Sequence, residues 1–192
     1  MNLLHPEPML VLLAILCLLS SSVAEFEDFL LWFRSNGGVE TGIGIQSYSA
    51  DYRGIECKQQ VEENSQVLHI PLQLSLSASK ASSHPIHTKI IASLGQPDLA
   101  LIAILLYEKN NKDSFWKPYL NILPNQVRNA LYFTKEELEA FQNPSLRKRI
   151  LALQKQMNEN YNTLIEKWNE LHISEYSITI EDFMWASSII DR

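Results

Sequence analysis

Hydrophobic and polar positions along the chain follow one periodicity before residue 80 and another after Pro97. Residues 39–79 contain three short stretches, GIGIQSYS, GIECKQQV and QVLHIPLQLSLS, in which apolar and polar residues partly alternate. A period of two is typical of strands, and glycine or polar residues separate the stretches. From Pro97 onward apolar residues recur every three or four positions, which predicts helices. The pattern predicts an α+β fold, with a small β region before a helical region.

The helical region combines an apolar segment with one long amphipathic helix. LALIAILL, just after Pro97, is apolar on every side and predicts a helix buried on most of its faces. Asn143 and Pro144 suit the N-cap and first position of the long helix. Its predicted core stripe is Leu146, Ile150, Leu153, Met157, Tyr161, Leu164, Trp168 and Leu171. Capping boxes for two further helices are predicted at Thr134 with Glu137 and at Thr179 with Asp182.

The N-terminus has the pattern of a secretory signal peptide. MLVLLAILCLL is uninterrupted apolar sequence, and Ser22 and Ala24 after it fit the small positions before a cleavage site. We therefore predict a signal peptide over residues 1–24 and a secreted or secretory-pathway protein. The apolar run is shorter than the roughly 20 residues that span a bilayer, so no stable membrane span is expected after cleavage. The preceding MNLLHPEP lacks the Lys or Arg that usually stands before the apolar run of a signal peptide. The alternative is therefore a misassigned start and an intracellular or organellar location.

Composition narrows the function classes further. The chain has 192 residues, 46% of them hydrophobic, enough for one domain with a real core. A formal net charge of −6 offers no basic field for nucleic acid, which we exclude as a partner. Cys57 would be the only cysteine after cleavage, and a lone cysteine is usually buried. His84 and His87 lie in a Ser- and Pro-containing stretch without a carboxylate at metal-ligand spacing, so we predict solvated loop histidines and no metal site.

The segment SFWKPYLNILP carries the most specific signal. With LALIAILLYEKNN before it and ALYFTKEELEAFQN after it, it resembles the helical insert of the SET-domain methyltransferases related to Rubisco large-subunit lysine methyltransferase and actin-histidine methyltransferase. FLLWFRSNGG, QVLHIPLQLSLSASKA and TIEDFMWASSIIDR are similar to three further segments of that family. The resemblance covers residues 25–192 as a partial SET-like domain. It implies an N-terminal β region (25–96), a helical insert (97–178) and the start of the following helix (179–192).

The resemblance implies methyl transfer from S-adenosylmethionine to a lysine or histidine side chain of a protein substrate. In the family, a glycine-containing turn, the end of the following strand and an arginine of the late helix help to hold this cofactor. The matching positions are Gly54, Ser65, Gln66, Val67 and Arg192. Tyr52 stands where the family usually has the first glycine of G-x-G, a change that bears on how closely the backbone can approach the cofactor.

The printed chain ends at Arg192, before the Asn-His segment and the tyrosine that the resemblance leads one to expect. We therefore expect an N-terminal portion of an N-methyltransferase, without the catalytic C-terminal half. Two alternatives stay open: a non-catalytic secreted module that binds proteins through the insert, and an inactive truncated product. The sequence predicts neither catalytic residues nor an oligomeric state.

Overall fold

The computed structural model describes residues 26–49, 52–78, 84–127, 129–172 and 176–191. The predicted signal peptide and Arg192 lie outside the described residues. The chain divides into two compact units: the first contains residues up to Ser75 together with Pro118–Ile122, and the second contains Leu76–Lys117 and the residues from Leu123 onward. The described strands all belong to the first unit and the long helices to the second, so the predicted α+β fold is confirmed.

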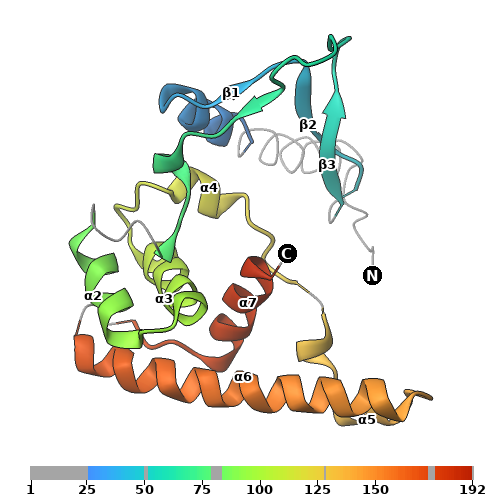
Figure 1. Ribbon diagram of the computed structural model, residues 1–192, viewed down its shortest axis with the longest axis vertical. Coiled ribbons are helices and arrows are strands. Elements are labelled where there is room, and N and C mark those ends of the chain that lie inside the picture. Colours follow the sequence, from blue (N-terminus) through green and yellow to red (C-terminus); the bar gives the residue numbers. More distant parts are fainter. Residues whose placement is uncertain (1–25, 50–51, 79–83, 128, 173–175, 192) are drawn as a thin grey trace, which may run out of the picture. The chain divides into compact units, whose positions relative to one another are not determined.

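The first unit contains a helix and two small antiparallel ladders (Figure 1). The helix covers residues 26–35. Strand β1 (Val39–Glu40) pairs with β4 (Leu68–His69), and β2 (Ile43–Ser47) pairs with β3 (Arg53–Cys57). The register of the second ladder sets Ile45 opposite Ile55 and Gln46 opposite Gly54. The prediction of strands in GIGIQSYS and GIECKQQV is therefore confirmed.

Two glycines end the helix over residues 26–35. Gly37 has φ +85, a left-handed conformation that glycine adopts without strain. The Gly37 N–H donates to the Arg34 carbonyl (3.0 Å) and the Gly38 N–H donates to the Phe33 carbonyl (2.9 Å), so both helix-end carbonyls are satisfied. A Cβ on Gly38 would lie 2.5 Å from the Phe33 ring. The chain therefore needs glycine at both positions to turn into β1.

The third predicted strand is mostly wrong. In QVLHIPLQLSLS only Leu68–His69 form β4, and Leu72–Leu74 form the 3-10 helix η1. Pro71 has no N–H with which to continue a ladder, so the strand ends before it. Cys57, at the end of β3, is exposed, which contradicts the expectation of a buried thiol.

The second unit is a group of helices (Figure 1). Its elements are α2 (Pro85–Leu94), α3 (Pro97–Asn110), η3 (Ala130–Tyr132), α5 (Lys135–Glu139), α6 (Pro144–Leu171) and α7 (Ile180–Ile190). The short α4 (Lys117–Asn121) separates α3 from η3 in the sequence. In Figure 1, α2, α3 and α7 lie on the same side of the long α6, and α3 packs against both α2 and α7.

Helix α3 is the centre of this core. As LALIAILL predicts, its side chains are buried on most faces, namely Leu99, Ala100, Ile102, Ala103, Ile104, Leu105 and Leu106. Each fully buried Leu or Ile of this kind contributes about 1.5–3 kcal/mol relative to an exposed one. Pro97 begins the helix, where its missing N–H would have no intrahelical partner. The position of α3 in the core is thus explained by its composition.

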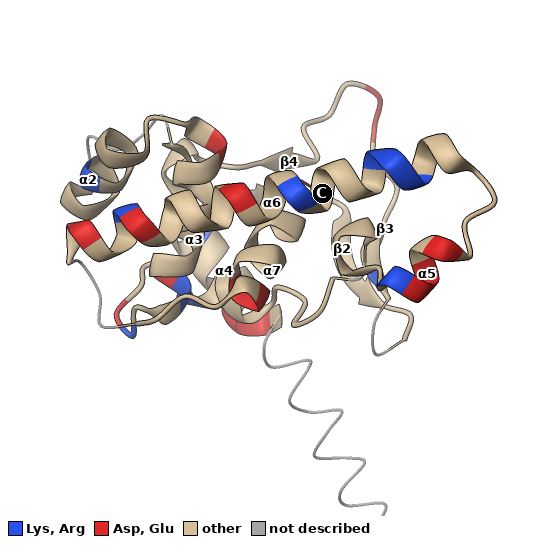
Figure 2. Ribbon diagram, turned by 90° about the horizontal axis from the view of Figure 1, so that it is seen from below, with Lys and Arg blue, Asp and Glu red and all other residues tan. Residues whose placement is uncertain are grey.

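The long helix α6 begins as predicted but buries a narrower stripe. Asn143 is its N-cap, accepting from the Leu146 N–H (3.1 Å), and Pro144 is its first residue. The buried positions are Ile150, Met157, Leu164 and Trp168. The predicted core residues Leu146 and Leu153 are instead 39% and 47% exposed, because they flank the buried stripe. Figure 2 shows charged residues of both signs along α6.

Both predicted capping boxes are present. The Thr134 side chain accepts from the Glu137 N–H at the start of α5, and the Thr179 side chain accepts from the Asp182 N–H at the start of α7. In each box the acidic side chain also accepts from the backbone N–H of the threonine. Among the helices that the structure describes, none has the length and apolar character required to cross a bilayer.

Candidate functional site

The cofactor candidates of the first unit lie on its two ladders. Gly54 is inside β3 rather than in a turn, and it faces Gln46 of β2. Ser65, Gln66 and Val67 immediately precede β4 and are exposed. The Val67 carbonyl accepts from the Thr41 N–H (2.9 Å), which extends the β1–β4 ladder by one bond. The structure therefore places the two candidate segments on different ladders of the same unit.

Gly54 has no local need to be glycine. Its φ is outside the left-handed region, and a Cβ there would meet the nearest Tyr48 ring atom at 3.5 Å, an ordinary contact. Tyr52 is exposed, with its ring centroid 5.3 Å from that of Tyr48. The fold alone therefore explains neither the glycine at 54 nor the tyrosine at 52. A ligand that approaches the backbone at Gly54 would explain the glycine.

The residues before β4 suit hydrogen bonding to a ligand. The Ser65 N–H and hydroxyl both donate to the Glu62 carbonyl (3.1 and 2.7 Å), so this turn is held in place. Gln66 is exposed and, within the described residues, makes no hydrogen bond. A fixed turn followed by the exposed Gln66 is compatible with a polar cofactor such as S-adenosylmethionine. Arg192, the remaining candidate, lies outside the described residues.

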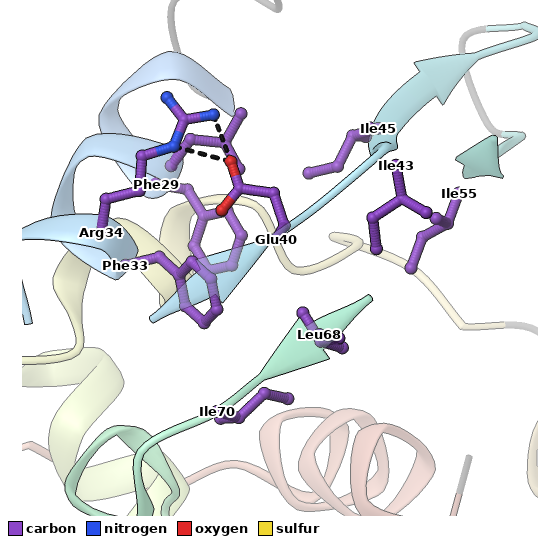
Figure 3. A pocket seen from close by; sticks show the side chains of 11 residues that line it. Phe29, Phe33, Arg34, Glu40, Ile43, Ile45, Ile55, Leu68 and Ile70 are labelled. Atoms are coloured by element: carbon purple, nitrogen blue, oxygen red, sulfur yellow. Dashed lines mark hydrogen bonds and ion pairs between the residues drawn. The ribbon is translucent and has the colours of Figure 1, made fainter. Parts of the chain in front are cut away.

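The first unit contains an apolar pocket of about 190 Å³. Figure 3 shows side chains from the helix over residues 26–35 and from all four strands around it. Its lining residues are Phe29, Leu30, Phe33, Arg34, Glu40, Ile43, Gly44, Ile45, Ile55, Leu68 and Ile70. Ile55 directly follows Gly54, and Leu68 directly follows Val67. None of the cofactor candidates Gly54, Ser65, Gln66 and Val67 is a lining residue, so the candidate segments adjoin the pocket in sequence without lining it.

One ion pair supplies the polar groups among these lining side chains. The Arg34 Nε donates to Glu40 Oε1 (2.6 Å), and a second guanidinium nitrogen contacts the same oxygen (Figure 3). The Arg34 side chain is 59% exposed and the Glu40 side chain 12% exposed. The remaining walls are aliphatic or aromatic, so the pocket suits an apolar group better than a charged one.

The SFWKPYLNILP segment contributes aromatic side chains to both units. Trp116, in the second unit, has its ring centroid 5.6 Å from that of His87. Tyr119, in the first unit, lies 6.5 Å from the Phe29 ring centroid. Burial raises the pKa of Tyr119, so its hydroxyl is neutral at physiological pH. These contacts favour packing as the role of both aromatic residues.

The second unit contains a buried polar cluster that the sequence reasoning missed. His87 is 4% exposed and lies in α2, and its Nε2 is 2.6 Å from Glu108 Oε1 of α3. The prediction of solvated loop histidines is therefore wrong for His87, although no carboxylate stands at metal-ligand spacing in the sequence. Glu108 comes 21 positions after His87, so only the packing of α2 on α3 brings the two together.

Electrostatics keep Glu108 ionised despite its burial. Burial alone would raise the pKa of this carboxyl, but hydrogen bonds from His87 and Ser114 and the nearby charges of His87 and His84 lower it below its ordinary value. Glu108 is 1% exposed, and a buried carboxylate is stable only with such compensation. The sequence signal for this pair was weak: one acidic residue that follows the apolar run of α3 and precedes Lys109 and Asn110.

Comparison with solved structures defines the class of fold. The SET domain of LSMT bound to methyl-lysine and AdoHcy matches 85% of this chain with a TM-score of 0.74 and 23% identity, and the match covers 38% of that chain. Rubisco LSMT bound to sinefungin and monomethyllysine matches 84% of this chain with a TM-score of 0.72 and 23% identity, again over 38% of that chain. The chain therefore has the fold of part of a SET domain.

Curated relatives point to the same family. Actin-histidine N-methyltransferase of Mus musculus is 26% identical over 179 residues, and that of Homo sapiens is 25% identical over the same length. Each alignment covers 87% of this chain and 30% of the relative, so the chain spans about a third of the length of these proteins. No family model matches the chain. The chain is thus similar to SET-domain protein methyltransferases in sequence and in fold, which confirms the resemblance drawn from its sequence.

Proposed function

We propose that this chain forms the cofactor-binding part of an S-adenosylmethionine-dependent N-methyltransferase that acts on protein side chains. The likeness to a SET domain bound to AdoHcy, with a TM-score of 0.74, carries the proposal. The fixed turn at Ser65 and the exposed Gln66 after it support the proposal. The curated relatives are named for histidine, and the similar solved SET domain holds methyl-lysine, which supports a side-chain nitrogen of a protein as the acceptor.

The residues have distinct roles in this proposal. Backbone groups of Ser65, Gln66 and Val67 other than the paired Ser65 N–H and Val67 carbonyl hydrogen-bond to the cofactor, and Gly54 lets it approach β3 closely. Arg192 offers a positive charge for the carboxylate of the cofactor. S-adenosylmethionine, when bound, supplies a methyl group already activated by a sulfonium. The chain itself contributes alignment, because a fixed site places the methyl in line with the acceptor nitrogen.

Calorimetric titration of S-adenosylmethionine into the full chain tests the proposal. We expect saturable binding that Arg192→Ala weakens at least tenfold and that Lys135→Ala leaves unchanged. Lys135 is a suitable control because its side chain is 84% exposed in α5, in the second unit. Circular dichroism on each protein establishes that it is folded. A folded chain that binds neither S-adenosylmethionine nor S-adenosylhomocysteine would overturn the proposal.

Gly54→Ala gives a sharper test of the site. Because a Cβ at this position makes only an ordinary contact, the variant should fold like the natural chain. If the cofactor approaches the backbone at Gly54, the added methyl should weaken binding. Unchanged affinity would remove Gly54 from the site while leaving residues 65–67 in it.

A second candidate function is a non-catalytic module that binds another protein. Exposed apolar side chains of the first unit favour it, namely Ile55, Leu68, Ile70 and Leu72. An exposed apolar patch of this kind is typical of protein contact surfaces. A folded chain that binds no cofactor but elutes as a complex with a protein partner would favour this candidate over methyl transfer.

A further inference from the structure

We propose that His84, His87 and Glu108 form a zinc(II) site in the second unit. His84 is the N-cap residue of α2, His87 lies in the first turn of that helix, and Glu108 lies in the last turn of α3. One ligating atom from each of the three lies within 4.8 Å of the others. The cluster is separate from Gly54 and residues 65–67, which belong to the first unit, so the inference does not depend on the proposed methyl transfer.

An unpartnered nitrogen is the observation that points to a ligand. Among the described residues, His84 Nδ1 is buried and has no hydrogen-bond partner. Buried polar side-chain atoms are paired in the large majority of cases, so this nitrogen calls for an explanation. The His84 side chain does not cap α2 either. A metal ion accepts the lone pair of a neutral imidazole nitrogen and would satisfy it.

The charge of the cluster also favours a cation. Glu108 is 1% exposed, and the imidazole of His87 is the closest group that can compensate its charge. The nearest lysine in sequence, Lys109, instead lies with its Nζ 3.7 Å from the centre of the Trp185 ring. A divalent ion among the three side chains would neutralise the carboxylate and leave both histidines uncharged.

The donor set selects the metal. Two imidazole nitrogens and one carboxylate oxygen are a typical zinc ligand set, with water in the fourth position. Zinc–nitrogen bonds of about 2.0–2.1 Å place tetrahedral ligand atoms roughly 3.3 Å apart. On zinc binding, the 2.6 Å distance between His87 Nε2 and Glu108 Oε1 would therefore increase slightly. The His84 nitrogen, which lies within 4.8 Å of the other two ligand atoms, would move closer to them.

The surroundings resemble the outer shell of a metal site. Ser114 hydrogen-bonds to Glu108 and orients the carboxylate. The rings of Tyr107 and Trp116 lie against His87, with centroids 6.3 and 5.6 Å away. Outer hydrogen bonds and apolar walls fix ligand orientation and limit water access. Zinc at this position would join α2 to α3.

The alternative is that His87 and Glu108 are simply a buried hydrogen-bonded pair. The variant His84→Ala distinguishes a zinc site from a simple pair, because it removes a zinc ligand and leaves the His87–Glu108 contact in place. His87→Gln and Glu108→Gln would break that contact and could unfold the unit, so they are not the primary test. His69→Ala is a matched control, since His69 is exposed in β4 of the first unit.

The experiment is a competition titration of zinc(II) between a chromogenic chelator and the metal-stripped full chain. We expect one zinc per chain, a higher thermal midpoint with zinc, and at least a tenfold loss of affinity in His84→Ala but not in His69→Ala. Cys57→Ser should bind as the natural chain does, which removes the exposed thiol as the ligand. Equal zinc affinity in the natural chain and His84→Ala, or no binding, would overturn the proposal.

Discussion

The indole N–H of Trp185 in α7 donates to the carbonyl of Pro124, 2.8 Å away. Pro124 closes the SFWKPYLNILP segment, and Trp185 belongs to TIEDFMWASSIIDR, so the bond joins two segments that carry the family resemblance. Trp185 is 7% exposed, and Lys109 lies over its ring. One side chain therefore connects the end of the segment, α3 and α7 within the second unit.

Trp185→Phe should destabilise the chain. The substitution keeps an aromatic ring but removes the N–H, which leaves the Pro124 carbonyl without this donor, and it also reduces the buried volume. We expect a loss of about 1–3 kcal/mol in the free energy of unfolding, measured by urea denaturation. The matched variant Phe115→Leu, at a residue 43% exposed, should cost less. A Trp185→Phe chain as stable as the natural one would show that the bond contributes nothing measurable.

Gly38→Ala should destabilise the first unit while Gly54→Ala should not. A Cβ on Gly38 would lie 2.5 Å from the ring of the buried Phe33, whereas a Cβ on Gly54 makes only an ordinary contact with Tyr48. Overpacking of this kind costs about 1–3 kcal/mol. Thermal unfolding of the two variants compares them directly. Equal melting temperatures would mean that the Phe33 ring moves aside without cost.

Stability should fall as pH rises from 10 to 12 because of Tyr176. Burial and the hydrogen bond that its hydroxyl donates to Asp182 (2.6 Å) raise the pKa of Tyr176 to about 12. The unfolded chain releases this proton near pH 10 and the folded chain only near pH 12. The protonated Tyr176 hydroxyl therefore stabilises the folded state fully below pH 10, and this stabilisation is lost between pH 10 and pH 12. The difference in unfolding free energy between the natural chain and Tyr176→Phe should shrink across it. A constant difference would contradict the prediction.

Asp182 should make the same cluster sensitive to acid. Burial would raise the pKa of Asp182, but hydrogen bonds from Tyr176 and Thr179 lower it overall below its ordinary value. The folded state thus holds this proton less tightly than the unfolded state, and the stabilisation is lost as pH falls through the folded pKa. Asp182→Asn should therefore cost stability at pH 7 and less at pH 3, measured by urea denaturation. An equal cost at both pH values would count against the charge of Asp182 as the cause.

The signal peptide is a separate prediction about residues 1–24. Expression in a secreting eukaryotic cell should yield a chain that begins at Glu25, because Ser22 and Ala24 are the small residues that signal peptidase requires. Mass spectrometry of the secreted protein measures its first residue. Ala24→Arg should block cleavage at this point. An intracellular chain that retains residues 1–24 would support the alternative of a misassigned start.

The sequence by itself determined where several helices begin, because the residues that specify these starts are neighbours in the chain. Pro97 and the apolar run after it specify the start and the burial of α3, Asn143 and Pro144 specify the start of α6, and the threonine boxes specify α5 and α7. These signals act within a turn or two of helix, so they can be read without knowledge of the fold. The family resemblance was also visible, because it depends on the order of short motifs.

Only the tertiary structure decided which side chains meet. His87 and Glu108 are 21 positions apart, and the burial that makes their contact strong arises when α2 packs on α3. Likewise, Phe29, Ile45 and Leu68 line one pocket because the helix over residues 26–35 and two separate ladders surround it. Leu146 and Leu153 have the helical spacing of core residues, yet they remain exposed where nothing in the described fold covers them. Periodicity identifies the face of a helix, but burial depends on what packs against that face.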